Sequence, residues 1–143
     1  MRKTFNKESI SDELAIKMIE KAKQKALEKG RPSVIAIVDE SGILKAFLRM
    51  DGAPLLSVQV AIDKAYTAAG YNLPTHAWYD FIKNDPPLAT GATTGIDRLI
   101  IFGGGFPIKI NGKTVGGIGV SGGHYTEDME VAESALKVIE EEE

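Results

Sequence analysis

Cysteine is absent from the 143-residue chain, and histidine occurs only twice. The absence of thiols excludes disulfide bonds, thiol catalysis, iron–sulfur clusters and cysteine-type zinc sites. The sequence also lacks an N-terminal hydrophobic segment of the signal-peptide kind and any apolar run of about 18 residues. We therefore expect a cytoplasmic protein that is neither secreted nor membrane-spanning.

The chain as a whole carries a small negative charge. The formal net charge is −3, without the basic stripe that nucleic-acid binding requires, so we expect no nucleic-acid partner. Hydrophobic residues make up 43% of the chain and charged residues 26%, which is typical of globular proteins. Length and composition together predict one domain that spans residues 1–143 and buries its own core.

Hydrophobic periodicity and turn residues predict the element order α-β-β-α-α-β-β-β-α. Helices are expected from a capping pattern at 9–12 to about 29, at 55–69, from 75 to about 84, and from 127 onward. Strands are expected at 34–38, 43–50, 99–102, 106–110 and 113–121. Residues 88–97 have no periodicity and many threonines and glycines, so we expect a loop there.

The predicted strands belong to one antiparallel sheet. Asn111 and Gly112 tolerate the positive φ angles of a type I′ turn, and they predict a hairpin between the last two strands. Residues 34–38 and 99–102 are apolar at odd and even positions alike, as in strands that are covered on both faces. The sequence therefore predicts an α/β (α+β) fold, a three-layer α-β-α sandwich with one antiparallel sheet of about five strands.

The stretch GGIGVSGG at residues 116–123 matches the dinucleotide-binding pattern G-x-G-x-x-G. A dinucleotide site of that type needs a second parallel strand after the following helix. Only residues 123–143 follow the motif, and they are predicted to be helical, so we reject the hypothesis of a dinucleotide-binding site. Together with the glycines at 103–105, the motif indicates bare strand backbone, against which a helix, another subunit or a flat ligand lies.

Several short blocks of the sequence occur in the order found in one family. They are Val38-Asp39-x-x-Gly42, Arg49-Met50-Asp51-Gly52-Ala53, Lys64-Ala65, Ile101-Phe102-Gly103-Gly104-Gly105-x-Pro107, Gly116-x-x-Gly119-Val120-Ser121-Gly122-Gly123, and Glu127-Asp128 followed by Ala132. Over nearly its whole length the chain resembles a small haem-binding or haem-degrading family. That family includes the glycolate-operon protein GlcG, haem-binding sensors, the C-terminal domain of PduO-type corrinoid adenosyltransferases, and stand-alone proteins encoded beside dehydratases.

The resemblance implies a profilin-like α-β-α sandwich that assembles into even-numbered homo-oligomers, from dimer to octamer. It also implies binding of haem or a related tetrapyrrole, and it favours haem over a corrinoid such as cobalamin. It does not imply adenosyltransferase activity. In the two-domain relatives that chemistry belongs to a separate N-terminal helical domain, which this sequence does not contain.

Both histidines are candidate ligands of a haem iron, which usually takes an axial His, Met, Cys or Tyr. His76 lies beside aromatic residues at the start of a short predicted helix, and His124 follows a pair of glycines. A structural or merely exposed role is the alternative for each. His124 also stands where the resemblance would place a small residue. Weaker candidates are Tyr66, Tyr71 and Met50.

Three cations beside apolar runs could hold carboxylates or phosphates, namely Arg49, Lys64 and Arg98. Lys64 lies in the middle of an otherwise apolar predicted helix. Its alternative role is an ion pair with Asp51 or Asp63, or a side chain that extends to solvent. The glycines at 103–105 complete the predicted cofactor-binding set, because we expect the tetrapyrrole cleft near the glycine-rich strands.

No catalytic constellation is present in the sequence, neither a Ser-His-Asp arrangement nor a P-loop nor a metal-binding pair of histidines. The sequence favours a homo-oligomeric accessory protein that binds haem or a related tetrapyrrole. Two alternatives stay open. One is an enzyme that degrades haem or processes a small acid. The other is a ligand-free structural or chaperone-like accessory of a dehydratase or glycolate operon.

Overall fold

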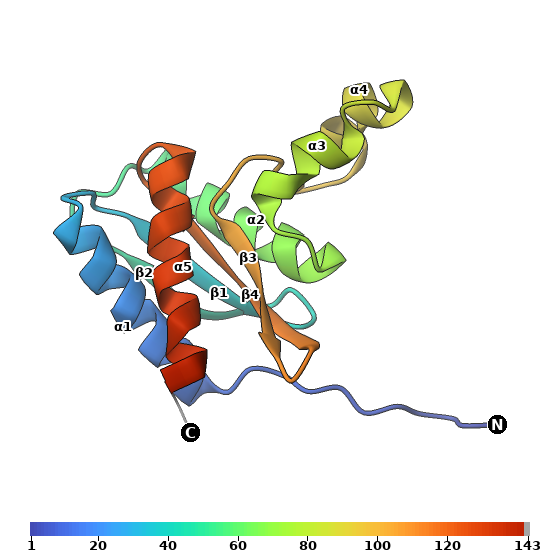
Figure 1. Cartoon of the computed structure of the whole chain (residues 1–143), viewed down its shortest axis with the longest axis horizontal. Helices are drawn as coiled ribbons and strands as arrows, with labels where there is room; N and C mark the ends of the chain where they lie inside the picture. Colours follow the sequence, from blue (N-terminus) through green and yellow to red (C-terminus); the bar gives the residue numbers. More distant parts are fainter. Residues whose placement is uncertain (142–143) are drawn as a thin grey trace.

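A computed structural model describes residues 1–141, which form a four-stranded antiparallel sheet between two helical layers (Figure 1). The strands are β1 (Val34–Asp39), β2 (Leu44–Arg49), β3 (Gly105–Ile110) and β4 (Lys113–Ser121), in the spatial order β2-β1-β4-β3. Helices α1 (Asp12–Glu28) and α5 (Tyr125–Glu141) cover one face, and α2 (Leu56–Tyr71) covers the other. The predicted three-layer architecture is confirmed. Residues 142–143, the end of the predicted domain, lie outside the described residues.

The central strands formed where the sequence predicted them. All side chains from Val34 to Val38 are fully buried, because α1 and α5 cover one side of β1 and α2 covers the other. The turn between β3 and β4 has φ angles of 52° at Asn111 and 78° at Gly112, as the hairpin signal predicted. No helix within residues 1–141 is both long enough and apolar enough to cross a bilayer.

A small helical lobe, residues 73–101, projects from the sandwich between α2 and β3 (Figure 1). It contains the 3-10 helix η1 (Thr75–Ala77), α3 (Trp78–Ile82) and α4 (Pro86–Gly95). The lobe has a separate small core of Trp78, Ile82 and Ala92, with Leu73, Leu99 and Ile101 packed against it. It is therefore joined to the sandwich but does not share the main core.

Two predictions about this region are wrong. Most of residues 88–97, expected as a loop, belong to α4, whose N-cap Asp85 accepts a hydrogen bond from the Leu88 N–H at 3.4 Å. The strand expected at 99–102 does not form, so the sheet has four strands and not about five. The apolar pattern there has another cause, because Leu99 and Ile101 pack into the core of the lobe.

The glycines of β4 allow α2 to lie directly on the sheet. A Cβ added at Gly117 or Gly119 would collide with backbone oxygens of α2. On the neighbouring strand, a Cβ at Gly105 would lie 2.5 Å from the carbonyl oxygen of Lys64, and Gly105 is paired with Gly119. The structure therefore confirms the interpretation in which a helix packs against this bare backbone.

Candidate functional site

His76 lies in an open cleft where the lobe meets the sandwich. The cleft has a volume of about 370 Å³ and is lined by His76, Tyr79, Asp80, Ile101, Phe102, Gly103 and Tyr125. Its residues come from η1 and α3, from the segment that precedes β3, and from the first turn of α5. Elements far apart in the sequence thus converge on one hollow, which we call the His76 cleft.

Aromatic side chains in this cleft are unusually open to solvent. Tyr79 is 60% exposed, Phe102 46% and Tyr125 44%. The imidazole of His76 lies with its centroid 5.5 Å from that of the Phe106 ring. A soluble protein rarely leaves a group of large apolar surfaces uncovered unless they contact a partner or ligand. Chemically, the cleft offers one imidazole and several aromatic surfaces to a flat apolar molecule.

His124 lies beside the cleft without lining it. Its ring centroid is 4.4 Å from that of Tyr125, and its Nδ1 is 2.9 Å from Oγ1 of Thr126. Its backbone N–H donates to Oε1 of Glu127 at 3.2 Å. That backbone hydrogen bond is the main reason why the pKa of Glu127 is lowered, with a further contribution from Arg31. His124 therefore belongs to the N-terminal cap of α5, and His76 is the histidine that lines the cleft.

Lys64, one of the predicted cofactor-binding cations, is buried in the interior. Its side chain is 1% exposed, and its Nζ donates to Oδ2 of Asp128 at 3.1 Å and to the carbonyl oxygen of Val120 at 2.8 Å. Burial lowers the pKa of Lys64 and raises the pKa of Asp128, and the opposite charge of each partner counteracts the shift. The alternatives to a cofactor-binding role were an ion pair with Asp51 or Asp63, or a side chain that extends to solvent. Lys64 does form an ion pair, but with Asp128, and its side chain does not reach solvent. The first turn of α5 brings Asp128 to the lysine.

The other predicted cations and tyrosines lie outside the His76 cleft. Arg98 pairs with Asp63, Nε to Oδ1 at 2.8 Å, and its guanidinium carbon lies 3.8 Å from the ring centroid of Tyr66. Tyr71 packs against the ring of Trp78, with centroids 5.3 Å apart. These side chains connect α2 to the lobe.

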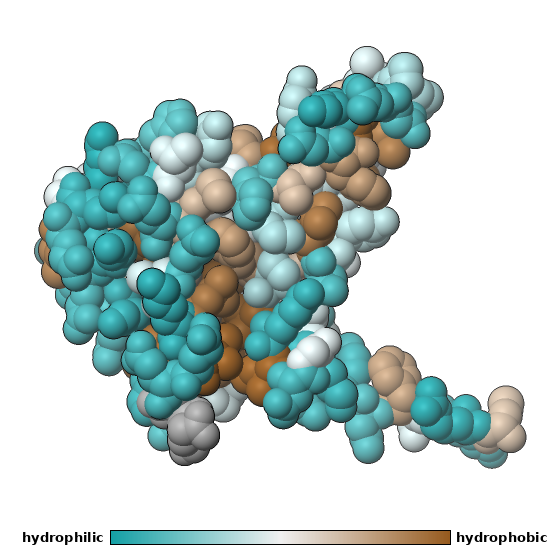
Figure 2. Space-filling view, in the orientation of Figure 1, coloured by the Kyte–Doolittle hydropathy of each residue, from teal (hydrophilic) through white to brown (hydrophobic). Residues whose placement is uncertain are grey.

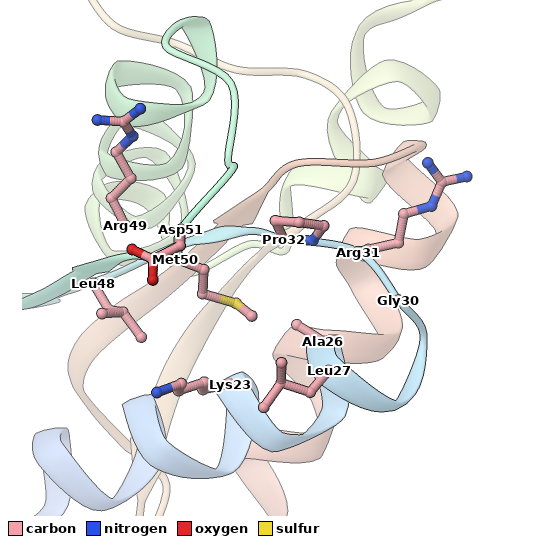
Figure 3. Close-up of a pocket in the computed structure, with 10 residues that line it drawn as sticks. All are labelled: Lys23, Ala26, Leu27, Gly30, Arg31, Pro32, Leu48, Arg49, Met50 and Asp51. Atoms are coloured by element: carbon pink, nitrogen blue, oxygen red, sulfur yellow. The ribbon is translucent and has the colours of Figure 1, made fainter.

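Arg49 and Met50 line a different hollow of about 510 Å³, between α1 and β2 (Figure 3). Figure 3 shows the side chains of Arg31 and Arg49 directed away from its middle. Met50 is only 7% exposed, and its sulfur accepts a weak hydrogen bond from the Ser33 N–H at 3.4 Å. This hollow therefore has cations near its rim but presents no imidazole.

Of the three glycines at 103–105, only Gly103 lines the His76 cleft. A Cβ at Gly103 would lie 2.6 Å from Sδ of Met129 and 3.1 Å from Cδ2 of Tyr125, so this backbone packs tightly against α5. At Gly104, where φ is 127°, a Cβ would lie 2.6 Å from Nζ of Lys64. The glycine run thus passes between the cleft and the buried lysine.

Five of the seven residues that line the cleft were not predicted as part of a site, namely Tyr79, Asp80, Ile101, Phe102 and Tyr125, and neither was the buried Asp128. Phe102 was assigned to a buried strand, although the three glycines that follow it signal an irregular segment. Asp128 stands in the first turn after a pair of glycines, a position where an acid commonly contacts backbone N–H groups. Within the described part of the chain, no group of three or more His, Asp or Glu side chains could hold a metal ion.

The sequence is similar to known proteins along nearly its whole length. The family model described as "Haem degrading protein HbpS-like" matches residues 10–137. A 15.0 kDa protein from the dhaT–dhaS intergenic region of Citrobacter freundii is 37% identical over 99% of each chain. The corrinoid adenosyltransferase PduO of Salmonella typhimurium is 33% identical over 76% of this chain and 32% of its own, so the chain spans about a third of that relative.

Solved structures share the fold. Protein ORFY of Klebsiella pneumoniae matches 100% of this chain and 99% of its own, with a TM-score of 0.93 and 31% identity. A structure described as a PduOC:heme complex matches 92% of this chain and 95% of its own, with a TM-score of 0.84 and 29% identity. The resemblance carried by the short sequence blocks is thereby confirmed. The chain belongs to the HbpS-like family.

Proposed function

We propose that the protein binds haem in the His76 cleft, with the imidazole of His76 as the axial ligand of the iron. The observation that carries the proposal is the imidazole set among exposed aromatic side chains, a donor set that suits a flat macrocycle with a central metal. Family membership supports it, as does the similarity to a structure that contains haem.

The residues of the cleft have separate tasks in this proposal. Phe102, Tyr79 and Tyr125 would contact the faces and edges of the ring, and His76 would hold the iron and exclude water from that side. Lys83, which is not itself a lining residue, would be the cation for a propionate, since its Nζ pairs with Oδ1 of the lining residue Asp80 at 2.9 Å. Bound haem would supply iron redox chemistry. Because the cleft is open, part of the macrocycle would stay in solvent or against a second subunit.

The test is a titration of the purified protein with hemin, followed by the Soret band, beside a cobalamin titration. We expect saturable binding of hemin at micromolar concentration and none of cobalamin. His76→Ala should shift the Soret band and weaken binding at least tenfold. His124→Ala is the matched control and should leave both unchanged. Absence of saturable hemin binding, or an unchanged spectrum in His76→Ala, would refute the proposal.

Haem degradation is the second candidate function, because the matching family model carries that description. Adding ascorbate and catalase to the hemin complex under air separates the two functions. Decay of the Soret band over minutes, faster than for free hemin, would assign turnover to the protein, and a stable band would assign binding.

We further infer that the lobe forms a contact between copies of this chain. Figure 2 shows apolar surface on the lobe, where the exposed large side chains are Tyr79, Phe81, Leu88 and Ile96. Helix α4 contains two prolines, three threonines and two glycines among ten residues, a composition that does not support an isolated helix. A lobe with these properties gains stability when a second copy covers it.

Light scattering of the protein tests this contact. We expect a mass between dimer and octamer. The double substitution Phe81→Ser and Leu88→Ser should reduce that mass, because both side chains lie on the exposed surface of the lobe. Leu27→Ser, at a 60% exposed position on α1, is the control and should leave the mass unchanged. A monomeric wild-type protein, or an unchanged mass in the double variant, would contradict the inference.

A further inference from the structure

The buried Lys64–Asp128 pair connects three elements at one point. Lys64 belongs to the middle of α2, and Asp128 belongs to the first turn of α5. The lysine also donates to Val120 near the end of β4, and Oδ1 of Asp128 accepts from the Gly123 N–H at 3.1 Å. Two side chains thus bind α2, β4 and the loop that leads into α5.

The same pair lies directly behind the His76 cleft. The Nζ of Lys64 is 5.2 Å from the ring centroid of Phe102, which lines the cleft. The backbone at Gly104 passes so close that an added Cβ would lie 2.6 Å from that Nζ. On the other side, Tyr125 lies three residues before Asp128 on the same helix. The segment at 102–104, which carries the lining residues Phe102 and Gly103, and the start of α5 therefore both meet at this ion pair.

A buried ion pair of this kind is a poor source of stability. Removing both charges from water costs free energy, and well-packed apolar replacements are often neutral or stabilising. An apolar pair would not reproduce the directional hydrogen bonds to the carbonyl of Val120 and the N–H of Gly123. The pair therefore contributes position more than stability.

We propose that Lys64 and Asp128 are positioning residues that set the spacing between Phe102 and Tyr125, and so the fit of the ligand in the His76 cleft. The inference rests on the proposed function for its consequence in haem binding. Neither residue touches the ligand. Both act through the backbone segments that carry the lining side chains.

Two variants separate position from stability. The double substitution Lys64→Met and Asp128→Leu removes both charges together, so we expect a folded protein with a thermal midpoint close to that of wild type. It should nevertheless bind hemin at least tenfold more weakly, with a shifted Soret band. Asp128→Asn keeps an oxygen that can accept from the Gly123 N–H, so it should lose stability yet keep hemin affinity within about threefold. Lys29→Met is the matched control, because it breaks the exposed pair between Lys29, at the end of α1, and Glu130, which lies on α5 like Asp128.

Amide hydrogen exchange on the hemin-free proteins measures directly how firmly the two segments that flank the cleft are held. In the double variant, amides at 102–104 and 123–125 should exchange at least tenfold faster, while those of β1 stay unchanged. If wild-type protein takes up no hemin, the proposed function fails, and this exchange measurement alone decides the role of the pair. Unchanged exchange in both segments would overturn the inference. So would hemin affinity that simply follows stability across all three variants.

Discussion

Gly117 and Gly119 of β4 lie against the backbone of α2. At Gly91 and Gly95 of α4, by contrast, a Cβ added to the backbone would have no atom of another part of the chain within 4 Å. The first pair lies in the centre of the sandwich, and the second lies in the projecting lobe. In the strand, glycine is required because a helix occupies the space of the side chain. In the helix, glycine has no such partner and only lowers helix stability.

This contrast distinguishes two kinds of stability in one chain. The sandwich is held by close contact of backbone on backbone and by side chains of β1 that are fully buried. The lobe has a small core of three buried hydrophobic residues, and most of the surface of α4 is exposed. We therefore expect substitutions to have large effects in the sandwich and small effects in the lobe.

The largest effect is expected for Gly119→Ala. The added methyl group would meet the backbone of α2 at Ala61 and Ala65, which can yield only by moving the helix away from the sheet. We expect a loss of at least about 3 kcal/mol in the free energy of unfolding. Urea denaturation followed by far-UV circular dichroism measures it. A loss below about 1 kcal/mol would show that α2 is not held at this distance from β4.

A somewhat smaller effect, with a defined pH dependence, is expected for Asp128→Asn. At pH 7 the variant should lose about 3 kcal/mol, because Lys64 is left buried without its counter-ion. Loss of Asp128 removes the interaction that raises the pKa of Lys64, so burial lowers that pKa further below 10.5. Between the lowered pKa and 10.5 the unfolded state binds more protons than the folded state, so stability rises with pH.

The penalty of Asp128→Asn should therefore shrink when urea denaturation is repeated between pH 7 and pH 10. Wild-type protein under the same conditions provides the reference curve. A penalty that stays constant or grows over this range would mean that Lys64 does not lose its proton in the folded variant.

The smallest effect is expected for Gly91→Ala in the lobe. The new methyl group meets no neighbour, and alanine favours the helix over glycine by about 1 kcal/mol. Amide exchange within α4 should slow about fivefold, with little change in the global midpoint of unfolding. Faster exchange would indicate that Gly91 faces a close neighbour, such as a second copy of the chain.

The sequence predicted those elements whose pattern has one physical cause. Residues 34–38 are apolar at odd and even positions alike, which indicated a strand covered on both faces. Asn111-Gly112 indicated the hairpin. The pattern at 99–102 looks the same, but there a separate small core takes up the apolar side chains. Periodicity reports burial and does not tell which core a segment joins. Helix α4 escaped prediction because its threonines and glycines carry no apolar stripe.

The site was predicted less completely than the fold. His76 and Gly103 were both proposed from the sequence, but nothing in the sequence places them in one cleft with Tyr125. The acid that pairs with Lys64 is 64 positions away, and it reaches the lysine only because β4 packs against α2 and leads directly into the first turn of α5. Neighbouring aspartates such as Asp63 were the natural guess, yet a residue adjacent on a helix points to a different face.

The burial of Lys64 also gives the chain an internal reporter. Reagents that acylate amines modify exposed lysines at once, but the Nζ of Lys64 is covered by Phe102, Gly104 and the first turn of α5. It becomes reactive only when those segments separate from α2. When acylation is faster than reclosing, the rate at which mass spectrometry detects this modification equals the rate at which the back of the cleft opens.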